Sequence, residues 1–160
     1  MWSVRVWAAL AIAWPLSADA QIQGDEPPVR AEARVDAIVA RATLLQAGLG
    51  VGFRTGYNIR THFVGAGGFA FKDGATEPSA RADATLRLLL DPFGENPFGL
   101  SIGGGLTLLY DGFDDTRALG MIVVGLEGAP RAPIVWAVEV GLGGGARVGV
   151  VLRPRAQRYR

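Results

Sequence analysis

The sequence predicts an all-β protein, an antiparallel up-and-down barrel of eight strands between residues 30 and 154. Apolar and polar residues alternate with a period of two through most of this stretch, as in strands with two different faces. No helical periodicity persists after residue 29. The prolines after residue 20 all fall between or outside the alternating runs, as expected of residues that lack an N–H in a paired sheet.

The first four strands are each expected to carry polar side chains on one face and apolar side chains on the other. The clearest is the fourth, in which Arg81, Asp83 and Arg87 alternate with alanine and leucine. The boundary between the first and second strands, Arg41-Ala42, carries no turn residue. The expected ranges are Arg30–Ala40, Thr43–Arg54, Tyr57–Phe71 and Ser79–Leu90.

The last four strands are expected at Phe98–Tyr110, Arg117–Glu127, Ile134–Gly143 and Ala146–Arg153. Leu109 breaks the alternation of the fifth strand, and the sixth strand is apolar on both faces, so its register is not predicted. The connections then alternate between two ends of the barrel. One end would hold Thr55-Gly56, Asp91–Pro97 and Gly128–Pro133; the other would hold Arg41-Ala42, Lys72–Pro78, Asp111–Thr116 and Gly144-Gly145.

The N-terminal segment Met1–Ala20 has the pattern of a secretory signal peptide. Arg5 precedes the apolar run Val6–Trp14, and Ala18-Asp19-Ala20 gives the small-x-small cleavage site. Only 13 uncharged residues separate Arg5 from Asp19, whereas a spanning helix needs ~20. We expect the mature chain to begin at Gln21, with residues 21–29 as a linker and residues 155–160 as a basic tail.

The composition excludes several classes of function. Sixteen basic residues against fifteen acidic residues give a net charge of +1, too small for nucleic-acid binding by bulk electrostatics. With one histidine and no cysteine, the chain offers little for a zinc, haem or iron–sulfur site. No metal and no cofactor are therefore expected.

The direction in which the polar face points distinguishes two kinds of eight-stranded barrel. A soluble barrel exposes its polar face to water, whereas a membrane barrel exposes its apolar face to lipid. The apolar faces of all strands but the unassigned sixth carry no charge, and the chain has a single lysine. The aromatic residues also gather at the strand ends in two bands, as in the girdles of a membrane barrel: Phe53, Tyr57, Phe98 and Trp136 at one end, and Phe69, Phe71 and Tyr110 at the other.

The polar face would then fill the interior of a transmembrane barrel. Eight strands enclose only enough space for side chains, and buried charges must be paired. We therefore expect an ion-pair network that closes the lumen, with glycines on the same face making room for the arginines. The expected members are Glu32, Arg34, Asp36, Arg54, Arg60, His62, Arg81, Asp83, Arg87, Glu139 and Arg147.

With this architecture, the chain resembles the small eight-stranded bacterial outer-membrane β-barrel superfamily over Arg30–Pro154. The resemblance implies a Gram-negative outer-membrane location, contact with lipid, insertion by the outer-membrane assembly machinery and both termini in the periplasm. The chain departs from the family at its end. The last strand ends near Leu152 and is followed by Arg153-Pro-Arg-Ala-Gln-Arg-Tyr-Arg160, so Tyr159 is penultimate where the family commonly has a C-terminal aromatic residue.

Four local features suggest chemistry, and each also has a structural explanation. Gly141–Ala146 matches a dinucleotide fingerprint, but a strand follows where a helix is required. The resemblance includes enzymes that modify lipid A with a histidine and a serine, for which His62 and Ser101 would be the candidates. The acidic loop Asp111–Asp115 lacks the spacing of a calcium site. The basic tail, Arg153 included, would contact anionic headgroups or peptidoglycan, or simply be solvated.

The expected function is therefore that of a monomeric, non-enzymatic outer-membrane barrel. Its role would be envelope integrity, or surface interaction through Lys72–Pro78 and Asp111–Thr116. Two alternatives stay open: a soluble periplasmic barrel that binds a lipid-like molecule inside, and an outer-membrane enzyme that modifies lipid A.

Overall fold

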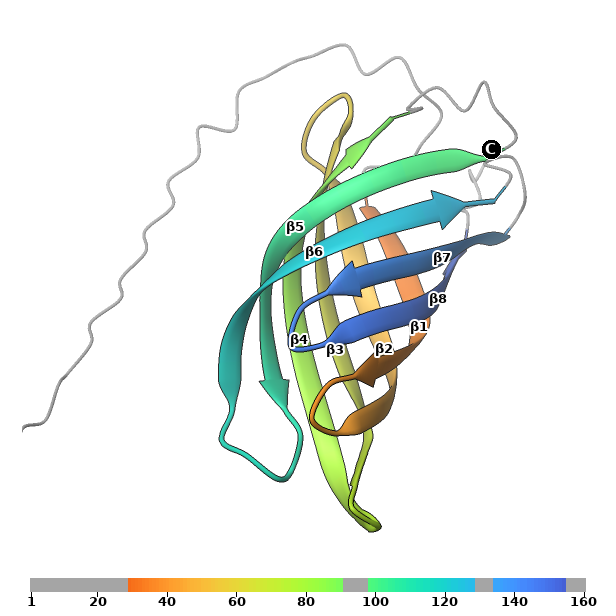
Figure 1. Ribbon diagram of the computed structural model, residues 1–160. Helices are drawn as coiled ribbons and strands as arrows, with labels where there is room; N and C mark the ends of the chain where they lie inside the picture. The colour runs from red at the N-terminus through yellow and green to blue at the C-terminus, as the bar shows by residue number, and fades with distance from the viewer. Residues whose placement is uncertain (1–28, 91–97, 129–133, 155–160) are drawn as a thin grey trace, which may run out of the picture.

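The computed structural model describes residues 29–90, 98–128 and 134–154. The expected signal peptide, nearly all of the linker, the basic tail and most of two connections lie outside these residues. The described residues form a closed barrel in which each strand is antiparallel to the next and β1 pairs with β8 (Figure 1). The strands are β1 (Val29–Val39), β2 (Thr43–Arg54), β3 (Ile59–Lys72), β4 (Ala75–Leu89), β5 (Gly99–Tyr110), β6 (Arg117–Glu127), β7 (Ile134–Leu142) and β8 (Ala146–Pro154).

The predicted fold class and all eight strands are confirmed. The boundary at Arg41-Ala42 is also correct, because β1 ends at Val39 and β2 begins at Thr43. The described residues include no helix that is long and apolar enough to cross a membrane.

The predicted loop Lys72–Pro78 is wrong. β3 and β4 continue through it to a two-residue turn at Asp73-Gly74, where φ is +50° and +81°. Asp-Gly is a preferred pair for such a hairpin turn because both residues tolerate positive φ. Pro78 consequently lies inside β4 and not in a turn. It is placed where β4 pairs with β3 alone, since the β4–β5 ladder begins at Ala80.

The register of β6, which the sequence did not predict, places Met121, Val123 and Gly125 inside the barrel. Leu109 also points inward and is only 1% exposed. It belongs to an apolar cluster that fills the lumen at the end of the barrel opposite to the start of β1 and the end of β8. The cluster consists of Ile38, Ala42, Leu44, Ala70 and Leu109, with Phe113 packed against it.

The outward side chains of the strands, which alternate with the buried ones, include no charged residue among the described positions. Large apolar side chains dominate this face; Leu49 is 73% exposed and Leu106 65% exposed. Glu77, which is exposed near the β3–β4 turn, belongs to the other face, which continues inward as Ser79 and Arg81. The barrel therefore buries its charged side chains, beside an apolar cluster at one end, and presents an apolar surface.

Candidate functional site: a buried ion-pair network

A network of charged side chains occupies the lumen. The alternation of β1, β3, β4, β7 and β8 places every second residue inside, so that charges far apart in sequence meet across the barrel. We call this set the lumen network; its members are all at least nine-tenths buried: Glu32, Arg34, Asp36, His62, Arg81, Asp83, Arg87, Glu139, Arg147 and Arg153.

Glu139 on β7 is one centre of the lumen network and is fully buried. Its carboxylate accepts hydrogen bonds from Arg34 Nη2 at 2.8 Å, from Arg153 Nη2 at 2.9 Å and from both Nη atoms of Arg87, the Nη2 bond measuring 3.0 Å. Three guanidinium groups from three strands therefore share one carboxylate. Charge-assisted hydrogen bonds of this kind fix both position and orientation.

Asp36 on β1 is the second centre and is also fully buried. It accepts two bonds from Arg34, from Nε at 2.8 Å and from Nη2 at 2.9 Å. Arg147 Nε donates to it at 3.2 Å, and Arg81 Nη2 donates to it as well. Asp83 joins the same group, because Arg147 Nη1 donates to its Oδ2 at 2.9 Å. Arg34, bonded to both Asp36 and Glu139, connects the two centres.

Arg153 corrects the expectation of a solvated basic tail. Its side chain is 1% exposed and donates to Glu32 at 3.0 Å, to Glu127 at 2.6 Å and to Glu139 at 2.9 Å. Neither Arg153, a member of the lumen network, nor Glu127, its partner at the rim, was predicted as part of it. The signal was present in the sequence, because Arg153 continues the inward series of Arg147, Gly149 and Val151 in β8.

Arg54 and Arg60 lie at the rim, only partly buried, and not in the lumen network. Arg54 Nη2 donates to the carbonyl of Tyr57 at 3.5 Å, and Arg60 Nη1 lies 3.6 Å from Glu127 Oε2. These two arginines therefore close the outer edge of the polar interior near the chain ends.

His62 is buried with its Nδ1 at 3.2 Å from Glu32 Oε2. Ser101, the candidate partner for nucleophilic chemistry, instead donates to the carbonyl of Gly125 at 3.4 Å. No hydrogen bond joins His62 to a serine among the described residues. The arrangement is that of a packed histidine held by a carboxylate.

Two other candidate sites take on structural roles. Gly143–Gly145 form the turn between β7 and β8, so no helix follows the fingerprint Gly141–Ala146. In the acidic loop, Asp111 accepts hydrogen bonds from the backbone N–H groups of Phe113 and Asp114 and pairs with Arg117. Within the described ranges, no group of three or more histidine, cysteine or carboxylate side chains is placed to hold a metal.

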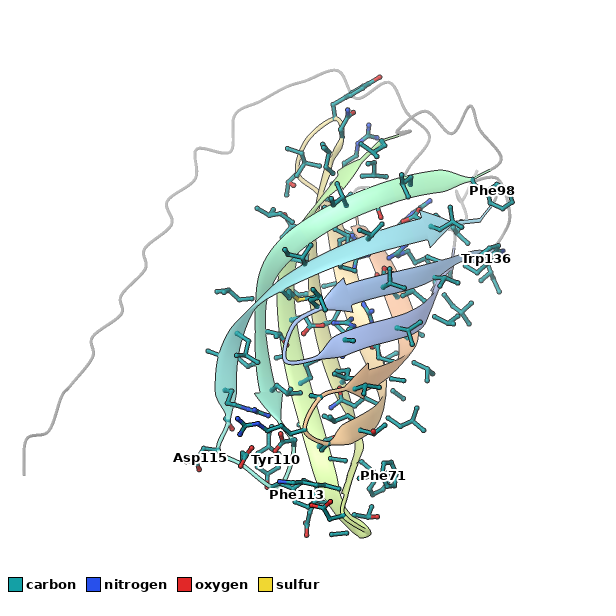
Figure 2. All side chains as sticks on the ribbon, viewed as in Figure 1. Phe71, Phe98, Tyr110, Phe113, Asp115 and Trp136 are labelled. Carbon is teal, nitrogen blue, oxygen red and sulfur yellow. The ribbon has the colours of Figure 1, made fainter. Side chains whose placement is uncertain are left out.

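The seven aromatic residues predicted to form the girdles, Phe53, Tyr57, Phe69, Phe71, Phe98, Tyr110 and Trp136, are all exposed. Figure 2 shows Phe98 and Trp136 at the end where β1 begins, and Phe71 and Tyr110 at the opposite end. Phe113, near the second group, has a different role. It packs on the apolar cluster inside, and Lys72 Nζ lies 5.6 Å from the centre of its ring.

Glycines that face the lumen leave space for the side chains of the network. Gly50 shows how little space remains for a side chain at such a position. A Cβ at this position would lie 2.7 Å from the carbonyl oxygen of Phe63, 2.9 Å from Val64 Cγ2 and 3.1 Å from Glu32 Cγ. We expect Gly50→Leu to destabilise the barrel by ~1–3 kcal/mol through overpacking, measured by urea unfolding. Gly65→Ala is the control, since its Cβ would meet nothing within 4 Å. Equal stability of both variants would contradict the close packing around Gly50.

Comparison with known proteins supports the fold. No family model and no curated protein matches the chain. Among solved structures, it is similar to Neisserial surface protein A, with 14% identity and a TM-score of 0.59, covering 80% of this chain and 96% of that one. It is also similar to the N-terminal β-barrel domain of Pseudomonas aeruginosa OprF, with 12% identity, a TM-score of 0.58 and coverage of 78% and 96%. The chain therefore shares its fold with these two proteins.

Proposed function

We propose that the chain is a non-enzymatic outer-membrane β-barrel with a closed lumen and a structural role in the Gram-negative envelope. One observation carries the proposal: the outward faces of the described strands carry no charge, while ten ionisable side chains are buried inside. This is the burial pattern of a protein whose surroundings are apolar. Strand lengths of 9 to 15 residues are compatible with the ~9–11 residues needed to cross a bilayer at a tilt.

The same pattern opposes the soluble periplasmic alternative. A soluble lipid-binding barrel would hide apolar side chains around its ligand and leave charges in water. Here Leu49, Leu106 and their neighbours face outward, whereas Arg34, Asp36 and Glu139 are buried. The exposed aromatic residues at both ends support girdles at the two membrane interfaces.

The proposal includes the partners that such a barrel would have. Lipid would cover the outward face, and the assembly machinery would insert the chain, which would function as a monomer without nucleic acid. Surface contacts would use the end opposite to the chain ends, where the Asp73-Gly74 turn and the 111–116 loop project (Figure 1).

Membrane fractionation and electrophoresis with and without boiling test the location. We expect the protein in the outer-membrane pellet and faster migration of the unboiled sample, because a hydrogen-bonded barrel stays compact in detergent. Recovery in the soluble periplasmic fraction would contradict the proposal.

Planar-bilayer recording tests the closed lumen. The buried lumen network and the apolar cluster at one end support a closed lumen, so we expect no steady conductance from the purified protein. Large, long-lived channel openings that occur only when the protein is added would show that the lumen is open.

A further inference from the structure

The half of the lumen network nearest to the apolar cluster contains polar atoms without partners. Arg81 and Arg147 share both Asp36 and Asp83 as ion-pair partners, so their guanidinium groups lie together. The Nη atoms that point to neither carboxylate, Arg81 Nη1 and Arg147 Nη2, have no hydrogen-bond acceptor in the part of the chain that the structure describes. Both arginines are more than nine-tenths buried.

Thr107 contributes a third such donor. It lies opposite Asp83 in the β4–β5 ladder and is 1% exposed, and its hydroxyl has no partner among the described residues. In the other half of the network, Arg153 uses all three of its nitrogen atoms, as does Arg34, which connects the two centres. Arg87 leaves only its Nε without a partner among the described residues. Unpaired acceptors near this place are Asp83 Oδ1 and Gln46 Oε1.

The charges of the lumen network do not cancel. Its five arginines face four carboxylates, and Glu127 at the rim is shared between Arg153, at 2.6 Å, and the partly buried Arg60, at 3.6 Å. Six arginines and five carboxylates, counted with Arg60 and Glu127 at the rim, leave one positive charge when His62 is neutral. An uncompensated buried charge is strongly unfavourable, and Ile38, Leu44 and Leu109 separate this half of the network from solvent at the nearer end.

We propose that a small monovalent anion, of the size of chloride, binds between Arg81 Nη1, Arg147 Nη2 and the hydroxyl of Thr107. Such an ion accepts N–H and O–H donors and also supplies the missing negative charge. Water would satisfy the donors but not the charge. Asp36 and Asp83 pair with the other nitrogen atoms of the two guanidinium groups and hold both groups in place. Only Arg81 Nη1 and Arg147 Nη2 are then left to bind the anion.

Urea unfolding of the purified, detergent-folded barrel tests the site, with Trp136 fluorescence as the signal. At constant ionic strength, we expect a higher unfolding midpoint in chloride or bromide than in gluconate, which is too large to enter. Above the dissociation constant, each tenfold increase in chloride should raise the folding equilibrium constant about tenfold. The barrel needs only to be folded, so the result does not depend on its location in the cell.

Two variants separate the site from general salt effects. Arg81→Gln removes one ligand and the extra charge, so its stability should no longer respond to chloride. Thr107→Val removes one ligand at similar shape and should shift the response to higher chloride. Arg54→Gln makes the same charge change at the rim and should respond as the unmodified protein does.

Crystals grown in bromide give a direct reading, even if Arg81→Gln does not fold. We expect anomalous density between Arg81 and Arg147, absent in Thr107→Val crystals grown at low bromide. Bromide found on the surface alone, as an adventitious ion only, would overturn the proposal. An equal chloride response of Arg81→Gln and Arg54→Gln would overturn it too.

Discussion

Replacing Glu139 by glutamine should destabilise the folded barrel by about 3–5 kcal/mol, because breaking a buried ion pair leaves charge without compensation. Glu139 is fully buried and accepts hydrogen bonds from Arg34, Arg87 and Arg153. Among the described residues it is the only carboxylate to which Arg87 is bonded. Urea unfolding followed by the fluorescence of Trp136, the single tryptophan after residue 20, measures the loss.

Glu127→Gln is the matched control, since Glu127 also pairs with Arg153 but its side chain is 13% exposed at the rim. We expect a cost of about 1 kcal/mol there, because solvent screens the charge that is left. Adding Arg87→Met to Glu139→Gln should recover part of the stability, as the stranded guanidinium is removed. Equal losses for the two glutamine variants would show that the interior is wet.

The fold could be predicted because an up-and-down barrel pairs each strand with the next in sequence. In β4, Arg81, Asp83 and Arg87 point inward and Leu86 points outward. This alternation can be read from the strand alone, yet it determines which face of the whole sheet lies inside the barrel. Once one face of every strand is apolar and uncharged, the register is restricted, since a slip of one residue would move every arginine to the outside.

The ends of the barrel could not be predicted in the same way. Alternation shows which face a residue occupies but not its height along the barrel axis. Leu109 broke the polar pattern because it belongs to the apolar cluster inside one end of the barrel. Arg153 was read as tail because its partner Glu32 is 121 residues away in sequence. By contrast, the pair of Arg34 and Asp36 is two residues apart and follows from the strand itself.

The strand register of β6 illustrates a further limit. Its inward residues Met121, Val123 and Gly125 are as apolar as its outward ones, because no charged member of the lumen network comes from this strand. Only pairing with β5 and β7 determines which face of β6 points inward. For example, Gly125 lies opposite both Ser101 and Glu139, which are buried.

Single cysteines at positions 86 and 87 should distinguish a membrane barrel from a soluble one, and the chain has no native cysteine to interfere. Leu86 is 58% exposed on the outward face, whereas Arg87 is 4% exposed inside. In intact membranes, a water-soluble maleimide should label neither Leu86→Cys nor Arg87→Cys well. A lipid-soluble probe should reach only Leu86→Cys, because lipid covers that face.

The free energy of unfolding of Leu86→Arg tests the same distinction between a membrane barrel and a soluble one. A charge on the lipid face near the middle of the membrane should cost ~2–4 kcal/mol, whereas an arginine on the surface of a soluble barrel would be solvated at almost no cost. The variant is measured by urea unfolding from lipid vesicles against Leu86→Ala, which shortens the same side chain without adding charge. Unchanged stability of Leu86→Arg, together with fast aqueous labelling of Leu86→Cys, would place this face in water and refute the membrane assignment.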